Sequence, residues 1–78
     1  MARYTIVNLR ADIKDINEAN ASAPTKLRVL PRNGYIGLDE MGHDGRCIRN
    51  IECGSARECL TAAQLWSSNV VTPLAPSL

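Results

Sequence analysis

The sequence predicts an α+β fold in which a three-stranded antiparallel meander carries two helices on one face, in the order αβββα. Asn33-Gly34 and Asp44-Gly45 separate three apolar stretches. These dipeptides are strong hairpin signals, because a type I′ turn needs positive φ at both central residues. A helical apolar period precedes the first stretch, and a capping box follows the third.

The chain of 78 residues has room for a single domain with a small core. We place this domain at residues 1–69. Residues 70–78 include Pro73 and Pro76, and we expect an extended or flexible C-terminal tail there.

The first helix is predicted from about Thr5 to Ala21, with Thr5 as the N-cap. An alternative interpretation makes Arg3–Val7 a strand and begins the helix after Asn8. We favour the helix from Thr5, because apolar residues recur at helical spacing. The residues of this stripe are Ile6, Leu9, Ile13 and Ile16.

The three strands are predicted over Leu27–Arg32, Tyr35–Glu40 and Arg46–Cys53. Two-residue turns set the register, and they place one set of residues on the inner face. This inner set is Leu27, Val29, Ile36, Leu38, Ile51 and Cys53. In this register Leu38 pairs with Ile51, and Ile36 pairs with Cys53.

Pro31 indicates which strand lies at the edge of the sheet. The register puts it at a non-hydrogen-bonded pair with Ile36, so the position that lacks an N–H faces away from the second strand. The first strand is therefore an edge strand, and the strand order is 1-2-3.

The last helix is predicted from about Ala56 to Ser68. It begins with a capping box, in which Ser55 and Glu58 each accept a hydrogen bond from the other's backbone N–H. Its inward stripe is Ala56, Cys59, Leu60, Ala63 and Trp66.

No catalytic or metal-binding motif is visible. The three cysteines (Cys47, Cys53 and Cys59) are six residues apart, wider than the tight pairs of zinc sites. An odd count without a CxxC pair fits a reducing cytoplasm. We expect Cys53 and Cys59 to face the core, His43 to be an exposed turn residue, and the protein to be a non-enzyme without a cofactor.

The outer face of the sheet is the candidate partner-binding surface. It collects an aromatic residue, two arginines and several apolar residues, a composition enriched at protein interfaces. The candidate residues are Tyr35, Arg28, Arg32, Leu30, Asp39, Met41 and Ile48. The partner would be a host protein or protein complex, or a second copy of the chain.

Charge separates this prediction from its alternative, a nucleic-acid-associated module. The formal net charge is +1, lower than is usual for a nucleic-acid binder. The order αβββα also occurs in double-stranded-RNA-binding domains, but a single Arg57 stands where they have a lysine cluster. The alternative would use Lys26, Arg28, Arg32, Arg46 and Arg49. No stretch is apolar enough for a membrane span, so no membrane partner is expected.

The hairpin region carries a family resemblance. The residues Arg32-Asn33-Gly34-Tyr35, Asp44-Gly45, Arg49 to Gly54 and Arg57-Glu58-Cys59 resemble small uncharacterised proteins of bacteriophages and prophages. The resemblance implies a mobile element acting in the cytoplasm of a bacterial host cell. It implies a binding protein that inhibits a host defence or regulatory protein, similar to anti-CRISPR proteins in size and context.

Overall fold

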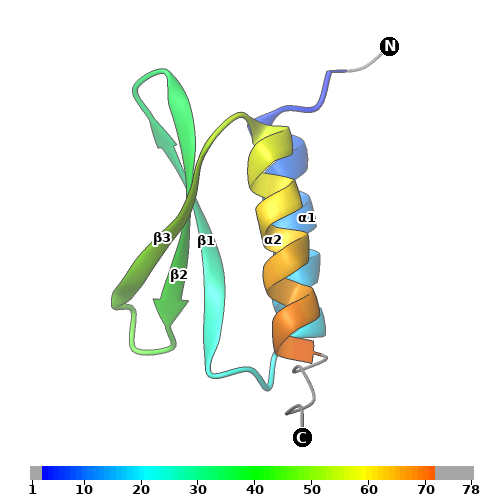
Figure 1. Cartoon of the computed structure of the whole chain (residues 1–78), viewed down its shortest axis with the longest axis vertical. Coiled ribbons are helices and arrows are strands. Elements are labelled where there is room, and N and C mark those ends of the chain that lie inside the picture. Colours follow the sequence, from blue (N-terminus) through cyan, green and yellow to red (C-terminus); the bar gives the residue numbers. More distant parts are fainter. Residues whose placement is uncertain (1–2, 72–78) are drawn as a thin grey trace, which may run out of the picture.

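A layer of two helices covers one face of a three-stranded sheet in the computed structural model, which describes residues 3–71 (Figure 1). The chain forms α1 (Ile6–Ala19), β1 (Thr25–Arg32), β2 (Tyr35–Gly42), β3 (Cys47–Gly54) and α2 (Ala56–Val71). The sheet order is β1-β2-β3, and both strand pairs are antiparallel. The predicted αβββα fold is confirmed.

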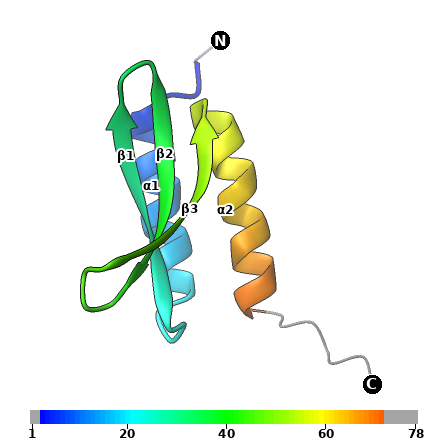
Figure 2. The ribbon, with the colours of Figure 1, turned by 60° about the vertical axis from the view of Figure 1, so that its left-hand side comes forward.

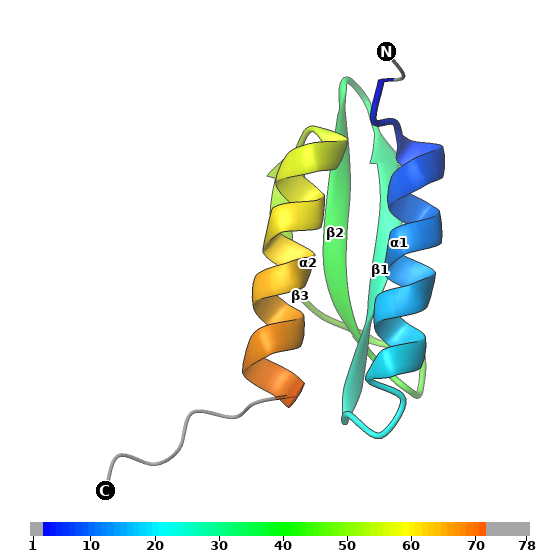
Figure 3. The same ribbon diagram turned by 90° about the vertical axis from the view of Figure 1, so that its right-hand side faces the viewer.

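The helices lie side by side with their N-terminal ends at the same end of the molecule (Figure 3). Their apolar stripes meet the inner face of the sheet, as predicted. The buried core cluster is Leu9, Ile13, Leu27, Leu38, Ala56, Cys59, Ala63 and Trp66. Val29, Ile36 and Ile51 pack against it, which confirms their predicted inward orientation.

Both helices begin where the sequence predicts. Thr5 is the N-cap of α1, and its N–H and hydroxyl donate to Asn8 Oδ1 at 2.9 and 3.1 Å. The alternative strand over Arg3–Val7 is wrong, because α1 starts at Ile6. At α2 the capping box is confirmed: the Ser55 N–H donates to Glu58 Oε1 at 2.8 Å, and the Glu58 N–H donates to Ser55 Oγ at 3.2 Å.

The predicted C-terminal ends of the helices need correction. Helix α1 ends at Ala19 rather than Ala21, because the side-chain amide of Asn20 donates to the Ile16 carbonyl at 2.7 Å and caps the last turn. Helix α2 continues past Ser68 to Val71 and includes two residues of the predicted tail. The rest of that tail, 72–78, lies outside the described residues.

The first hairpin has the predicted register, with Arg32 opposite Tyr35, Val29 opposite Leu38 and Pro31 opposite Ile36. The predicted turn type is wrong. Gly34 has a φ of 85°, whereas Asn33 is not among the residues with positive φ. A positive φ at the second central residue alone is the pattern of a type II turn.

The second hairpin departs from the predicted register. Gly42 N–H donates to the Arg46 carbonyl at 2.8 Å, so the loop has three residues, His43 to Gly45, and Gly45 alone takes positive φ, 89°. A three-residue loop with glycine in the left-handed region is the usual alternative to the type I′ turn. Asp44 therefore keeps ordinary backbone angles.

Two irregularities in β3 shift its pairing further. Glu40 faces Arg49 and Asp39 faces Asn50, but Leu38 faces Glu52 and Ile36 faces Gly54. The predicted pairs of Leu38 with Ile51 and Ile36 with Cys53 are therefore wrong. Ile48 and Ile51 are each an extra residue without a β2 partner, as in a β-bulge.

The bulges also change which side chains are buried. Cys53 lies opposite Gly37 and is exposed, so its predicted inward orientation is wrong, whereas Cys59 is fully buried as predicted. Bulges increase strand twist, and Figure 2 shows β3 crossing β2 toward the hairpin tip. The sheet is therefore strongly coiled at this end.

Candidate functional site

The outer face of the sheet carries a buried carboxylate held by three polar side chains, which we name the Asp39 cluster (Asp39, Arg28, Arg32 and Asn50). Asp39 Oδ2 lies 3.4 Å from Arg28 Nη2 and 3.9 Å from Arg32 Nη2. Asp39 Oδ1 accepts from the Asn50 amide at 2.9 Å. The Asp39 side chain is only 4% exposed, and such partners offset the cost of taking its polar atoms out of water.

The strand register places these residues together. Arg28 on β1 and Asn50 on β3 lie directly opposite Asp39 on the central strand. Arg32 reaches Asp39 from farther along β1, and it does so by crossing Gly37. A Cβ atom at Gly37 would lie 3.4 Å from Arg32 Nε, so the glycine leaves room for the guanidinium stem.

Tyr35 stands next to this cluster at the end of the sheet. Its side chain is exposed, and it pairs directly with Arg32 across the turn. Both residues line a shallow hollow of about 590 Å³ that is otherwise mostly apolar. The other lining residues are Ile6, Pro31, Gly34, Ile36, Gly54 and Ser55.

The predicted partner-binding residues differ in how far their side chains are exposed. Arg28 and Arg32 have side chains that are 43% and 48% exposed, so about half of each remains available to a partner. Leu30 is half-buried opposite Gly37. Ile48 is exposed, but it is an extra residue in a β-bulge and has no β2 partner. It therefore does not share the strand pairs that bring Arg28 and Asn50 to Asp39.

Asp39 and Met41 are corrections to the predicted exposed surface. They are 3% and 4% exposed, so neither presents a side chain to a partner. Asp39 is covered by its ion pairs. Met41 lies beside the pairing irregularity between Glu40 and Met41, at the strongly coiled end of the β2–β3 hairpin.

Glu40 forms a second carboxylate network, partly buried, that we did not predict. It accepts from Thr25 Oγ1 at 2.6 Å, Trp66 Nε1 at 3.0 Å and Arg49 Nε at 2.7 Å. Burial raises the pKa of Glu40, but the three hydrogen bonds and the Arg49 charge outweigh it and lower the pKa to about 2. Alternation from Leu38 places Glu40 on the inner face of the sheet. An acidic residue at an inner position is the sequence signal that could have predicted this network.

Cys59 and His43 carry the thiol and imidazole groups that the sequence analysis considered. Burial, and then the nearby Glu52, raises the pKa of the Cys59 thiol, so it is a poor nucleophile. His43 is exposed, as predicted, but its Nε2 donates to the Ala23 carbonyl at 2.8 Å and ties the hairpin tip to the loop before β1. Within residues 3–71 no three metal-ligating side chains cluster.

The arrangement on the outer face is suited to binding. Each guanidinium has five N–H donors, and Asp39 engages only part of them. Comparisons with family models, curated proteins and solved structures find no match to this chain. No helix in the described residues is long and apolar enough to span a membrane.

Proposed function

We propose that this chain is a non-enzymatic protein-binding module of a phage or other mobile element. It acts in the cytoplasm of a bacterial host and binds a host protein or protein complex. Its contact surface, which we name the anchor surface, consists of Tyr35, Arg28 and Arg32. By analogy of size and setting with anti-CRISPR proteins, the bound partner is a defence or regulatory protein that it inhibits.

The observation that carries the proposal is the fixed position of the two arginines. Asp39 is buried and ion-paired with both, so their guanidinium groups are held before a partner arrives. A side chain that is already ordered loses less entropy on binding. Arginine and tyrosine are also the residues that most often dominate interface energies.

The hollow beside Tyr35 supplies the apolar part of such a contact. Pro31 and Ile36 line it next to the tyrosine ring, and Arg32 forms its charged rim. An interface with an apolar centre and a polar margin needs this combination. A partner that inserts an apolar side chain into the hollow and offers a carboxylate to Arg32 fits this surface.

The alternative nucleic-acid function has less support. Three of its five basic residues are paired with carboxylates: Arg28 and Arg32 with Asp39, and Arg49 with Glu40. Paired cations release fewer counterions from phosphates on binding. The test is a titration of labelled DNA and RNA at rising salt, for which we expect no binding at physiological ionic strength.

The protein-binding function is tested by capture from nuclease-treated bacterial lysate, followed by mass spectrometry. We expect a host protein to be captured by the native chain and lost with Tyr35→Ala combined with Arg32→Ala. The control is Val7→Ala combined with Arg46→Ala, which removes an exposed apolar and an exposed basic side chain elsewhere. Equal capture by both double variants would place the contact surface elsewhere.

A further inference from the structure

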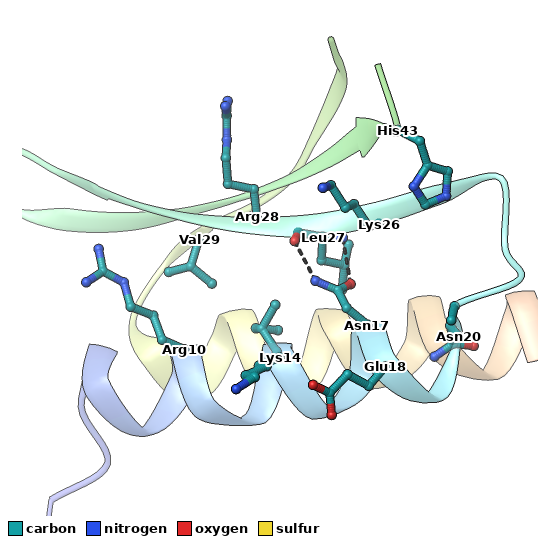
Figure 4. Close-up of a pocket in the computed structure, with 12 residues that line it drawn as sticks. Arg10, Lys14, Asn17, Glu18, Asn20, Lys26, Leu27, Arg28, Val29 and His43 are labelled. Carbon is teal, nitrogen blue, oxygen red and sulfur yellow. Dashed lines mark hydrogen bonds between the residues drawn. The ribbon is translucent and has the colours of Figure 1, made fainter. Parts of the chain in front are cut away.

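A groove runs between α1 and the outer edge of β1 (Figure 4). It shares only Arg28 with the Asp39 cluster among the described residues. It encloses about 580 Å³ and opens to solvent. Ile13 of α1 and Leu27 and Val29 of β1 provide its apolar lining. The sequence prediction identified β1 as an edge strand, but it did not predict a groove there.

Asn17 determines which part of the β1 edge is open. Its side-chain amide donates to the Leu27 carbonyl at 2.9 Å, and its Oδ1 accepts the Leu27 N–H at 2.8 Å (Figure 4). The backbone groups of Leu27 therefore point away from β2. Because this orientation repeats at every second residue of an antiparallel strand, those of Val29 and Pro31 point the same way.

Val29 is therefore the residue at which an added strand could pair in full. It offers both an N–H and a carbonyl on the groove side, whereas Pro31 offers only a carbonyl. Val29 is half-buried and lines the groove. An extended peptide that exchanges two backbone hydrogen bonds with one edge residue matches the spacing of an antiparallel pair.

The charges around the groove have predominantly one sign. Arg10 and Lys14 extend from α1, and Lys26 and Arg28 extend from β1. Glu18 is the single acidic residue among the described residues that line it. Arg10 and Lys14 come from one wall and Lys26 from the other, so three basic side chains flank the open edge at Val29, whereas Arg28 points away from α1.

We propose that this groove binds an extended acidic segment of a partner protein. The segment adds to the β1 edge by backbone hydrogen bonds with Val29, while its carboxylates meet Arg10, Lys14 and Lys26. Apolar side chains of the segment that point inward contact Ile13 and Val29. The inference rests on the proposed protein-binding function and adds a second contact site with a defined ligand chemistry.

The backbone geometry favours a peptide over a nucleic acid as the occupant. A nucleic acid would use the basic side chains alone, and it would leave the Val29 backbone pair and the apolar lining without complementary groups. Arg28, one of the four cations, is also paired with Asp39. An acidic peptide in extended conformation complements the backbone, the lining and the charge together.

The test measures binding of a fluorescein-labelled heptapeptide that alternates glutamate with valine, by fluorescence polarisation at low salt. We expect saturable binding that weakens as salt is raised, and a Val29 amide resonance that shifts on titration. A matched peptide with lysine in place of glutamate should not bind. Equal binding of the lysine peptide, or no saturable binding of the glutamate peptide, would overturn the proposal.

Val29→Pro tests the backbone contact directly. Proline removes the N–H that faces the groove but keeps the carbonyl, and edge strands tolerate proline at such positions. We expect the affinity for the glutamate peptide to fall roughly three- to tenfold, the loss of about one hydrogen bond. An unchanged affinity in a folded variant would overturn the strand-addition geometry.

Lys14→Gln combined with Lys26→Gln tests the charges independently of the backbone. The control is Arg3→Gln combined with Arg46→Gln, which changes the net charge equally outside the groove. We expect a roughly three- to tenfold loss for the lysine pair and less than twofold for the control. Equal losses would show a nonspecific charge effect and contradict the site.

Three further measurements separate this proposal from the anchor surface and from nucleic-acid binding. Tyr35→Ala with Arg32→Ala should bind the glutamate peptide with native affinity, because neither residue lines the groove. Capture of a host protein that depends on Tyr35, without peptide binding, would reject the groove and retain the anchor surface. Single-stranded DNA that displaces the peptide and binds more tightly would instead assign the groove to nucleic acid.

Discussion

Glu40 links the sheet to the last helix through a partly buried charge. Its carboxylate receives hydrogen bonds from a strand threonine, a β3 arginine and the Trp66 indole. All of these donors favour the ionised form, which explains why its pKa falls to about 2 although burial opposes this. The residue therefore links stability to pH.

The direction in which stability changes with pH follows from the pKa of Glu40 in the unfolded and folded states. In the unfolded chain a glutamate titrates near its ordinary pKa of about 4.3, whereas Glu40 in the fold titrates at about 2. Between these values the unfolded state binds more protons. The stabilisation by Glu40 is therefore complete above about pH 5 and is lost as the pH falls toward 2.

Glu40→Gln tests this linkage by urea unfolding at pH 6.5 and pH 3. We expect a destabilisation of about 2 kcal/mol at pH 6.5, because a charge-assisted buried contact is lost, and a smaller difference at pH 3. Glu18→Gln on the exposed face of α1 is the control and should change stability by less than about 0.5 kcal/mol. A difference that is constant with pH would contradict the assigned pKa.

Among the elements, β1 depends on a single side chain of α1 for its outer edge. Asn17→Ala should leave the part-buried Leu27 N–H and carbonyl without partners. We expect a loss of about 1–3 kcal/mol in unfolding free energy and a greater tendency to associate through the edge. Thermal melts and sedimentation velocity measure the two effects.

The control for this edge is Asp15→Ala, a change at an exposed position of the same helix. It should leave both the melting temperature and the sedimentation profile close to native. Asn17→Asp separates the two hydrogen bonds, because a carboxylate accepts from the Leu27 N–H but cannot donate to its carbonyl. Wild-type stability in Asn17→Ala would contradict the edge-capping role.

The elements also show where sequence reasoning succeeds. Pairing of β1 with β2 follows from Asn33-Gly34 and from alternation, because a tight turn leaves few possible registers. Pairing of β2 with β3 does not follow, because the extra residues Ile48 and Ile51 lie inside the strand, where no turn dipeptide marks them. Such a bulge leaves the apolar pattern almost unchanged.

At the scale of the whole molecule, Leu38 lies where the sheet meets the helices and is fully buried. Leu38→Ala should cost about 2–5 kcal/mol through lost transfer energy and a residual cavity. For a domain of this size the melting temperature should fall by at least about 8 °C. Leu65→Ala, at an exposed position of α2, is the control. An unchanged melt for Leu38→Ala would contradict the described core.

The candidate site was predictable in part. Arg28 opposite Asp39 follows from the register of the first hairpin alone. The approach of Arg32 across Gly37 is a diagonal contact, and it depends on a side-chain path that alternation does not specify. Burial of Met41 was not predictable from alternation, which places Met41 on the same outer face as Asp39.

The parallel arrangement of the helices has an electrostatic consequence. Because α1 and α2 point the same way (Figure 3), their macrodipoles add, and each contributes about half a positive charge at its N-terminal end. That end includes Ile6 and Ser55, which line the hollow beside Tyr35. A chain with a formal net charge of only +1 thus carries an electric dipole along its two helices. In the field of an acidic partner it would rotate during diffusion so that the Tyr35 end leads the encounter.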